Sequence, residues 1–340
     1  MRIGVNPLKR PNFQTGAVRQ PAPLTVCTVT YIPNHEGWFQ ESFEILKICI
    51  ASIRANTAEP FDLMVFDNGS AENVVDWLVE QHKEGSIQYL HLCDDNVGRV
   101  GSWNYLFSCA PGNWIAFTDS DVYFYPGWFE AMSQVYSAFP LAGSVSGCVM
   151  PHAFERDYSL AATFELSQED ESIRMERGQL ISDAQIYDYA DAIGKDRVEY
   201  LTRSRKSEQV RLERQGVSAY ATCNHWMFLV KTDLARSFLP FDGHAPLGPT
   251  QGIQWETRLN ECKKMQLSVV QPVVHHLGNS LTSKWLEVAQ KLNVNISISS
   301  PRVPAGPIKR MFLRIPKARG VARRISDYLF DFANGEHRID

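Results

Sequence analysis

The pattern with the clearest chemical meaning is the triplet Asp119-Ser120-Asp121, which directly follows the apolar run 114–118. Side chains of a strand alternate between its two faces, so Asp119 and Asp121 point the same way if the strand extends that far. Two carboxylates on one face can bind one divalent cation, or a cation and a ribose hydroxyl. The same residue types also favour a turn or a helix cap, and the triplet alone does not decide between these structures.

The chain before the triplet alternates between expected strands and expected helices. Apolar runs of strand length occupy residues 24–30, 61–66, 87–92 and 114–118. Apolar residues at helical spacing, or helix-like composition, follow the first three runs at residues 41–55, 71–82 and 102–108. This alternation predicts an α/β fold with a mostly parallel central sheet flanked by helices.

Polar residues follow these strands at the point where each strand ends. They are Thr30, Tyr31, Asp67, Arg99 and the Asp119/Asp121 pair. Because sheets of this kind bind ligands outside the carboxyl ends of their strands, we expect these side chains to meet in one crevice although they are far apart in sequence.

In this order and spacing, the chain resembles the family 2 type of GT-A-fold glycosyltransferases over roughly residues 24–280. Thr30-Tyr31 is similar to the nucleotide loop after the family's first strand, and Asp67-Asn68-Gly69-Ser70 is similar to a turn whose Asp contacts the base. Asn96-Val97-Gly98, followed by Asn104, resembles an Asn-x-Gly element and an Asn near the donor. Asp119-Ser120-Asp121 matches the family's metal-binding Asp-x-Asp motif.

The resemblance extends to two downstream segments. Segment 254–259 is similar to a helix start that carries an acidic pair, whose second member is the catalytic base in the family. Here Trp255 replaces the first acid and Glu256 keeps the second. The segment 273–280 resembles a His-containing segment that can complete the metal shell, and its spacing to Gly278 and Ser280 favours His275 over His276. Adjacent residues of an extended segment point to opposite faces, so we expect only one histidine to reach the metal.

The sequence departs from the family pattern in two places. The family often has Arg just before the characteristic Asn, whereas this chain has Trp103 there and its nearby guanidinium at Arg99. The acidic pair is reduced to Glu256, although one carboxylate is sufficient for a general base.

The resemblance implies a metal-dependent, inverting glycosyltransferase that uses a nucleotide-sugar donor and Mn²⁺ or Mg²⁺. Asp121 would bind the metal, Asp119 the ribose or a metal-bound water, and Glu256 would take the proton of the acceptor hydroxyl. Thr30, Tyr31, Asp67, Asn96, Arg99, Asn104 and Asp119 would contact the donor. A base opposite the leaving group implies a single displacement.

Plain structural roles compete with each of these assignments. Asp67-Asn68-Gly69 is also a tight-turn signal, and Glu256 also suits the first turn of a helix because of the helix dipole. Arg99 could pair with a surface acid, and a histidine at a strand end is often structural.

Two other functions remain open. A sugar-nucleotide nucleotidyltransferase also uses a parallel sheet and a metal, but the segment after the first expected strand, Thr30-Tyr31-Ile32-Pro33, has neither the glycines nor the basic residues of its phosphate loop. A noncatalytic nucleotide-sugar-binding protein would bind the donor without turnover.

Composition fits a globular enzyme and excludes some other classes. The chain has 340 residues, of which 44% are hydrophobic and 21% are charged, so it can bury a large core. Its formal net charge of −4 gives no nucleic-acid signature. Its seven cysteines are scattered without a Cys-x-x-Cys pair, which favours a reducing compartment and no structural zinc.

We predict three regions: an N-terminal arm at 1–23, a GT-A domain at 24–300 and a basic extension at 301–340. The domain divides into a donor half, 24–122, and an acceptor half, 123–300, with a helical insertion at about 154–215. Within the extension, residues 301–326 carry eight Lys and Arg and no acid, interleaved with apolar residues. This segment is either a contact with an anionic membrane surface or a basic tail, and its prolines argue against one continuous helix.

The remaining expectations concern location and acceptor. We found neither an apolar run of membrane-spanning length nor a signal-peptide core, so the sequence predicts a cytoplasmic protein, soluble or peripheral on the inner face of a membrane. The acceptor could be a glycan, a lipid-linked molecule or another hydroxyl compound. No motif in the sequence identifies the acceptor, the donor nucleotide, the sugar or the oligomeric state.

Overall fold

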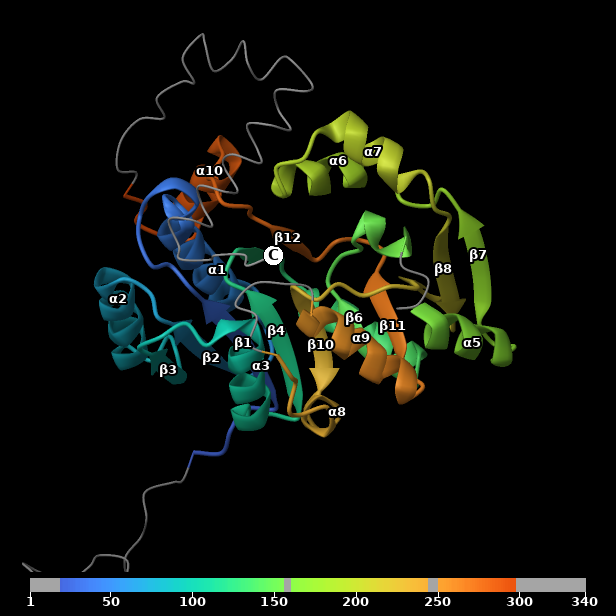
Figure 1. The fold of residues 1–340 in the computed structure, drawn as a ribbon, viewed down its shortest axis with the longest axis horizontal. Helices are drawn as coiled ribbons and strands as arrows, with labels where there is room; N and C mark the ends of the chain where they lie inside the picture. The colour runs from blue at the N-terminus through green and yellow to red at the C-terminus, as the bar shows by residue number, and fades with distance from the viewer. Residues whose placement is uncertain (1–18, 156–159, 244–249, 298–340) are drawn as a thin grey trace, which may run out of the picture. The chain divides into compact units, whose positions relative to one another are not determined.

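In the computed structural model of the chain, the described residues are 19–155, 160–243 and 250–297. They form a ten-stranded sheet, a small two-stranded sheet, and helices that pack on both faces of the large sheet (Figure 1). This architecture confirms the predicted fold class. None of the helices in these ranges is long and apolar enough to cross a membrane.

The first half of the large sheet is strictly parallel. Its strands lie in the order β3-β2-β1-β4, and their bounds are β1 Leu24–Thr30, β2 Phe61–Asn68, β3 Tyr89–Cys93 and β4 Trp114–Asp119. The connections run through α1 (Ser42–Asn56), α2 (Glu72–Lys83) and α3 (Gly98–Cys109). The carboxyl ends of the four strands therefore meet at one edge, as the sequence predicted.

The second half of the sheet is mixed. β10 (Met227–Lys231) lies between β4 and β6 (Ala142–Ser146) and is antiparallel to both. The order continues β11-β9-β8-β7, with bounds β11 Met265–Val269, β9 Val217–Tyr220, β8 Gln209–Arg214 and β7 Arg174–Gly178. The small sheet pairs β5 (Val122–Phe124) with β12 (Val274–His276). Because β10, β9 and β7 run against the other seven strands, the sheet is mostly but not wholly parallel.

Helices cover the sheet on two sides. Apolar residues of α1 and α2 pack in one core cluster with those of α4 (Trp128–Ala138). Apolar residues of α3 pack in a second cluster with those of α8 (Thr232–Ser237) and α9 (Thr250–Glu261). The remaining elements are α5 Ala161–Glu169, α6 Asp183–Ala192, α7 Arg197–Ser204, α10 Ser283–Lys291, and the 3₁₀ turns η2 Gly37–Phe39 and η3 Pro151–Glu155.

The expected insertion at 154–215 is not purely helical. It contributes α5, α6 and α7, but also β7 and β8, which extend the large sheet at the end opposite β3 (Figure 1). In β8, Val210 and Leu212 are buried while Arg211 lies opposite Glu176 of β7 and pairs with it. This alternation has the two-residue period of a strand. It was not recognised in the sequence because the charged residues give the segment a composition typical of helices.

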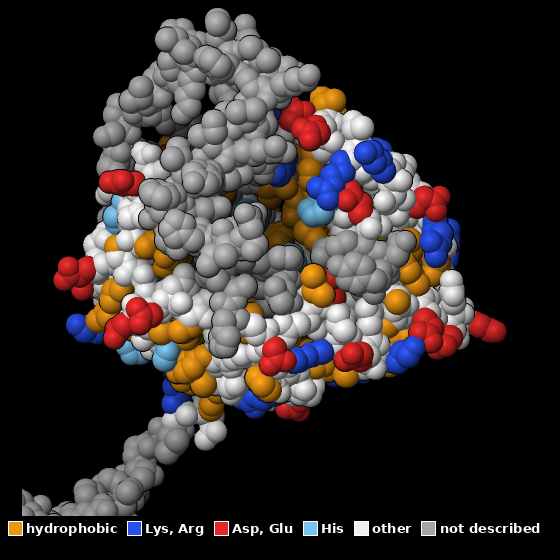
Figure 2. All heavy atoms as spheres, in the orientation of Figure 1, with side chains coloured by type: hydrophobic (Ala, Val, Ile, Leu, Met, Phe, Trp, Pro, Cys, Tyr) orange, Lys and Arg blue, Asp and Glu red, His pale blue; other side chains and the backbone are white. Residues whose placement is uncertain are grey.

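Surface charge is mixed over the described residues. Figure 2 shows acidic and basic side chains interspersed on the visible face. The basic segment 301–326 and residues 1–18 of the expected N-terminal arm lie outside the described residues.

Candidate functional site

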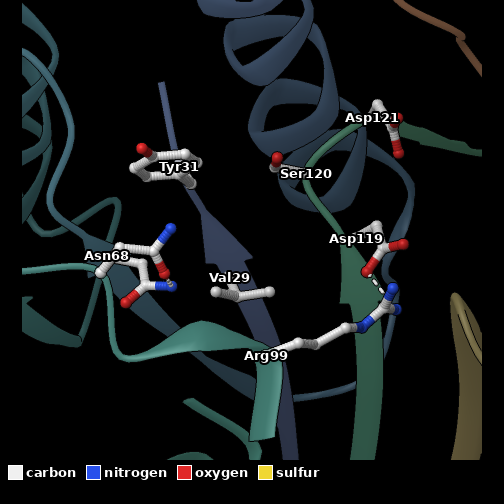
Figure 3. Close-up of a pocket in the computed structure, with 8 residues that line it drawn as sticks. Val29, Tyr31, Asn68, Arg99, Asp119, Ser120 and Asp121 are labelled. Carbon is white, nitrogen blue, oxygen red and sulfur yellow. Dashed lines mark hydrogen bonds and ion pairs between the residues drawn. The ribbon is translucent and has the colours of Figure 1, made fainter. Parts of the chain in front are cut away.

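A cavity of about 220 Å³ opens at the carboxyl ends of β1, β2 and β4. It is lined by Val29, Tyr31, Asn68, Asn96, Arg99, Asp119, Ser120 and Asp121. Figure 3 shows Tyr31 and Asn68 on one side of the cavity, Asp119 and Asp121 on the other, and Arg99 reaching toward Asp119. Five of the predicted site residues therefore line one cavity: Tyr31, Asn96, Arg99, Asp119 and Asp121.

Asp67 lies at the end of β2, just before a tight turn. Its Oδ2 accepts a hydrogen bond from the backbone N–H of Ser70 at 3.1 Å, and Gly69 follows with φ of 86°. The turn is tied to the end of β1, because Ser70 Oγ accepts from the N–H of Ile32 at 2.9 Å. Asp67 Oδ1 is buried without a hydrogen-bond partner, which leaves one acceptor of this carboxylate for a ligand N–H.

Thr30 also has an unused polar atom at this end of the sheet. Its side chain is buried and its Oγ1 has no hydrogen-bond partner, while the neighbouring Tyr31 is exposed and lines the cavity. The structure thus brings Thr30, Tyr31 and Asp67 to adjacent strand ends, since Thr30 and Asp67 are partners in the β1–β2 register.

Asn68 and Asn96 join the two loops beside this end. Asn68 Nδ2 donates to Asn96 Oδ1 at 2.7 Å, and Asn68 Oδ1 accepts from the N–H of Val97 at 2.8 Å. Asn96 Oδ1 also accepts from the N–H of Gly98, the first residue of α3. These bonds occupy Asn96 Oδ1, so this residue holds the start of α3 in place in addition to lining the cavity.

Arg99 is paired with the first aspartate of the Asp-x-Asp motif. Its Nη2 lies 2.6 Å from Asp119 Oδ1 and 3.1 Å from the carbonyl oxygen of His225. The guanidinium also lies 5.6 Å from the ring centroid of Trp103, one helical turn further along α3. Arg99 therefore places a positive charge at the carboxyl end of β4. It stands four residues before the position where the family often has Arg.

Asp119 is a carboxylate in a poorly hydrated position. Loss of hydration on burial raises its pKa to about 6, the nearby Arg99 cation opposes this shift, and the Asp121 charge adds to it. Its backbone is fixed, since its N–H donates to the carbonyl of Trp226 at 2.8 Å. The ion pair with Arg99 keeps negative charge at this position despite the desolvation.

Asp121 reaches the cavity from a turn and not from a continued strand. β4 ends at Asp119, and a two-residue turn leads to β5, so the expected strand alternation does not extend to Asp121. Asp121 still lines the same cavity as Asp119. Its Oδ1 is buried without a hydrogen-bond partner, and its carbonyl oxygen accepts from the N–H of Leu277 at 2.6 Å.

The choice between the two histidines has to be corrected. His276 Nε2 lies 3.6 Å from Asp121 Oδ2, whereas His275 Nδ1 lies 3.0 Å from Asp188 Oδ2 on α6. The β12–β5 register explains the difference, because adjacent residues of β12 point to opposite sides and His276 pairs with Val122, next to Asp121. Spacing to Gly278 and Ser280 does not reveal this register, so the prediction of His275 placed the wrong ring beside Asp121.

Asn104 does not face the cavity as expected. Its Nδ2 donates to the carbonyl of Phe241 at 3.0 Å, and its Oδ1 accepts from the N–H of the same residue at 2.7 Å. Both ends of the amide are therefore used to hold the segment between α8 and α9. Asn104 therefore supports that segment, and its contact with the donor stays a prediction.

Glu256 lies on α9. Its side chain is buried, and its charge contributes, after burial, to the raised pKa of Cys223. One turn earlier on α9, a side chain at Gly252 would lie 3.3 Å from the ring of His225, whose carbonyl oxygen accepts from Arg99. The helix that carries Glu256 therefore packs against His225, whose carbonyl oxygen contacts Arg99. Glu256 itself is not among the residues that line the cavity.

The two departures from the family pattern lie against each other. Trp103 stands where Arg is usual and Trp255 where the first acid is usual, and their rings are 6.0 Å apart at an interplanar angle of 81°. Both are fully buried in the cluster that packs α3 against α9. Two substitutions that look independent in sequence therefore form one apolar contact.

The oxygen ligands at the end of β4 fit a hard divalent cation that shares its coordination with phosphates. In the described part of the chain, no three His, Cys, Asp or Glu side chains are grouped closely enough to hold a metal by themselves. Asp121 Oδ1 is nevertheless free to bind, and Mg²⁺ is commonly held by one or two carboxylates together with substrate phosphates and water. The arrangement fits a cation that binds together with a diphosphate.

Three further residues shape this site. Asn68 bridges two loops, His276 faces Asp121, and Trp226 packs its ring 5.3 Å from that of His276. Asn68 could have been identified from its place in the turn motif. The role of Trp226 depends on β10 pairing with β4, which no local pattern encodes.

Comparison with known proteins confirms the resemblance. The family model described as glycosyl transferase family 2 matches residues 37–191, from just before α1 to the end of α6. This segment holds Asp67, Asn96, Arg99 and the Asp-x-Asp motif. This segment therefore matches the family 2 glycosyltransferases, as the sequence predicted. No curated protein sequence matches the chain.

Solved structures with related architecture share little sequence with this chain. A mannosyltransferase, PcManGT from Pyrobaculum calidifontis in complex with GDP-Man and Mn²⁺, is 14% identical over 78% of this chain and 59% of that chain, with a TM-score of 0.41. Residues 1–349 of S. aureus TarS are 13% identical over 81% and 67% of the two chains, with a TM-score of 0.43. The match thus spans less than two thirds of the mannosyltransferase.

Proposed function

We propose that this glycosyltransferase binds a nucleotide-sugar together with Mn²⁺ or Mg²⁺ and transfers the sugar to an acceptor hydroxyl with inversion. The main support for the proposal is a set of side chains at one edge of the sheet that are charged or have a buried polar atom without a hydrogen-bond partner. Thr30 Oγ1, Asp67 Oδ1 and Asp121 Oδ1 are buried without partners, and the Arg99 cation pairs with Asp119 in the cavity that Asp121 also lines. Buried polar atoms are normally hydrogen-bonded, so three orphans at adjacent strand ends indicate a ligand.

Along the edge of the sheet, these side chains would contact the successive parts of a nucleotide-sugar, from the base to the diphosphate. Asp67 and Thr30 would accept from the base and sugar of the nucleoside, beside the exposed ring of Tyr31. Arg99, Asp119 and Asp121 would meet the diphosphate end, where Asp119 is available to a ribose hydroxyl or a metal-bound water. The bound cation would offset the charge that develops on the leaving diphosphate.

In the reaction, the acceptor oxygen forms a bond to the anomeric carbon while the bond from that carbon to the diphosphate oxygen breaks. The hydroxyl proton passes to Glu256, whose side chain is buried on α9. Arg99 would contact the departing diphosphate, and a cation bound by Asp121 would offset its charge. A base on the face opposite the leaving group gives inversion in one displacement.

The test measures nucleotide release from a panel of nucleotide-sugars with and without Mn²⁺. Native chain, Asp121→Ala and Glu256→Gln are compared with the exposed-surface controls Asp76→Ala and Glu287→Gln. We expect nucleotide release that depends on the metal. Asp121→Ala and Glu256→Gln should each lower the rate of release at least 100-fold, which is typical for removal of one catalytic group. The two control variants should change the rate by no more than about twofold.

Each contrary result identifies the part of the proposal that fails. Binding without release would favour a noncatalytic nucleotide-sugar-binding protein. Pyrophosphate release would instead indicate a nucleotidyltransferase. Release that is unchanged in Glu256→Gln would remove the base assignment, and absence of metal-dependent binding for every donor would contradict the metal-dependent transferase.

A further inference from the structure

The two adjacent histidines of β12 make opposite hydrogen bonds through Nδ1. His275 Nδ1 lies 3.0 Å from Asp188 Oδ2, and this hydrogen bond lowers the pKa of Asp188. An ionised carboxylate only accepts hydrogen bonds, so Nδ1 of His275 carries the proton. His276 Nδ1 instead receives the backbone N–H of Gly278 at 3.0 Å. A backbone N–H only donates, so in the neutral His276 ring the proton is on Nε2.

This tautomer determines what His276 can offer to Asp121. A histidine binds a metal through an unprotonated nitrogen, and Nε2, the nitrogen that faces Asp121, carries the proton. The separation of 3.6 Å between Nε2 and Asp121 Oδ2 does not decide the question. It is longer than a normal hydrogen bond and also leaves room for two ligands around one ion. The Gly278 contact decides it.

The surrounding structure keeps His276 in this state. Gly278 has φ of 72°, and a Cβ at this residue would lie 2.5 Å from the carbonyl oxygen of Ala192 at the end of α6. The N–H of Leu277 is bonded to the carbonyl of Asp121, and Trp226 packs edge-to-face on the His276 ring. Binding a metal through Nε2 would require a proton on Nδ1, which would then face the Gly278 N–H with no acceptor between them.

We propose that His276 is a positioning residue, which directs its Nε2–H at Asp121 Oδ2 and leaves Asp121 Oδ1 for the cation. The cation would then be held by oxygen ligands only, supplied by the aspartates and the diphosphate. The inference depends on the proposed function only in assigning Asp121 to a cation. It differs from what the family resemblance implies, where a histidine of this segment completes the metal shell.

The first test needs neither metal nor substrate. The full chain is labelled with ¹⁵N-histidine, and long-range ¹H–¹⁵N spectra identify the tautomer of each ring, with His275→Gln and His276→Gln used for assignment. We expect the Nε2–H form at His276 and the Nδ1–H form at His275. The Nδ1–H form at His276 would overturn the proposal, whatever donor or metal the protein uses.

The second test examines the cation directly. Mn²⁺ is bound to the full chain together with a nucleoside diphosphate, and pulsed electron paramagnetic resonance measures ¹⁴N coupling to the ion. We expect no directly bound nitrogen. We also expect His276→Gln, which keeps a side-chain N–H donor, to retain Mn²⁺ affinity within about threefold, while His276→Ala weakens it about 10-fold, or about 1.4 kcal/mol.

Two results would contradict the proposal in this second test. A strong ¹⁴N coupling that disappears in His276→Gln would make His276 a ligand. Equal affinity in His276→Ala and the native chain would show that no positioning by His276 is needed. If Mn²⁺ does not bind even with the diphosphate, the metal-dependent function fails, and the tautomer measured in the first test decides the role of His276 by itself.

Discussion

Arg99 and Trp103 are one helical turn apart on α3, so either position can direct a side chain toward the end of β4. The chain uses the earlier position for the cation and the later one for the apolar core. This exchange explains how a sequence without the usual Arg keeps positive charge beside Asp119. It also explains why Trp255 can replace an acid, since Trp103 offers it a ring and not a charge.

Replacement of Arg99 by Gln tests this arrangement. The change removes the ion pair with Asp119 and the bond to the His225 carbonyl, and it leaves two aspartates without a cation beside a diphosphate. We expect the Kd for a nucleoside diphosphate with Mn²⁺ to rise about 10-fold, equivalent to about 1.4 kcal/mol, by calorimetry. The control is Arg174→Gln, because Arg174 is largely exposed. Equal affinity in both variants would mean that Arg99 interacts with Asp119 but does not contribute to diphosphate binding.

At the scale of elements, α6 is joined to β12 by the pair Asp188–His275. The hydrogen bond from His275 lowers the pKa of Asp188, so the native state binds a proton less readily than the unfolded chain. The stabilisation is therefore present above the unfolded pKa of about 3.9 and is lost as pH falls through the lower native value. Solvent screens the pair, because the Asp188 side chain is 60% exposed.

Asp188→Asn should consequently lower the free energy of unfolding at pH 7 by less than about 1 kcal/mol. The difference from the native chain should narrow as pH falls below about 4, because the unfolded chain then binds a proton at this position and, at still lower pH, the native Asp188 does so as well. Urea unfolding at several pH values measures both effects, with Asp233→Asn on α8 as an exposed control. A difference that grows on acidification would contradict the assignment.

Gly278 makes the second contact of α6 with this segment. Gly278→Ala combines a positive φ with a Cβ 2.5 Å from the Ala192 carbonyl, whereas Gly85→Ala combines a similar φ of 80° with open space. We expect a loss of about 1 kcal/mol for Gly85→Ala and at least 2 kcal/mol for Gly278→Ala by urea unfolding. Similar losses would show that α6 can move away from Gly278.

The elements of the first half were predictable because each one is a local pattern. The expected strand at 24–30 coincides with β1, and the expected helices at 41–55 and 71–82 differ from α1 and α2 by one residue at each end. The second half depends on distant partners. β8 becomes a strand by pairing with β7 and β9, and its charged alternate residues gave it the composition of a helix.

The site was predictable to the same extent. Residues at the ends of parallel strands converge by topology alone, and five of those predicted line the cavity. The contacts that Asn104 and His275 make were not predictable in this way. Phe241, the partner of Asn104, lies 137 residues further along the chain, and Asp188, the partner of His275, lies on α6. No spacing within a motif reports such contacts.

At the scale of the molecule, we propose that residues 24–300 form the catalytic unit, with a donor half at 24–122 and an acceptor half at 123–300. The family match ends at residue 191, so the second half is where acceptor selection would differ from relatives. We also propose that the basic segment 301–326, outside the described residues, contacts an anionic membrane surface and brings the site to a lipid-linked or membrane-associated acceptor.

A chain that ends at Ile296 tests the role of this segment. We expect it to keep the nucleotide affinity of the full chain within about twofold, but to lose co-sedimentation with vesicles that contain anionic lipid. Binding of the full chain should weaken as salt is raised from about 0.1 M to 0.5 M, because surface charges are screened. Neutral vesicles are the control. Equal sedimentation of the two chains would assign the segment another role.

The antiparallel strand β10 has a consequence for how the protein is made. β4 and the N–H of Asp119 obtain their partners on one side from residues 226–231, which leave the ribosome about a hundred residues later. Until then, the nascent chain presents the unpaired edge of an apolar strand, which can template association with another chain. Residues 24–122, the proposed donor half, are continuous in sequence, but the edge of β4 stays unpaired until most of the proposed acceptor half has been synthesised.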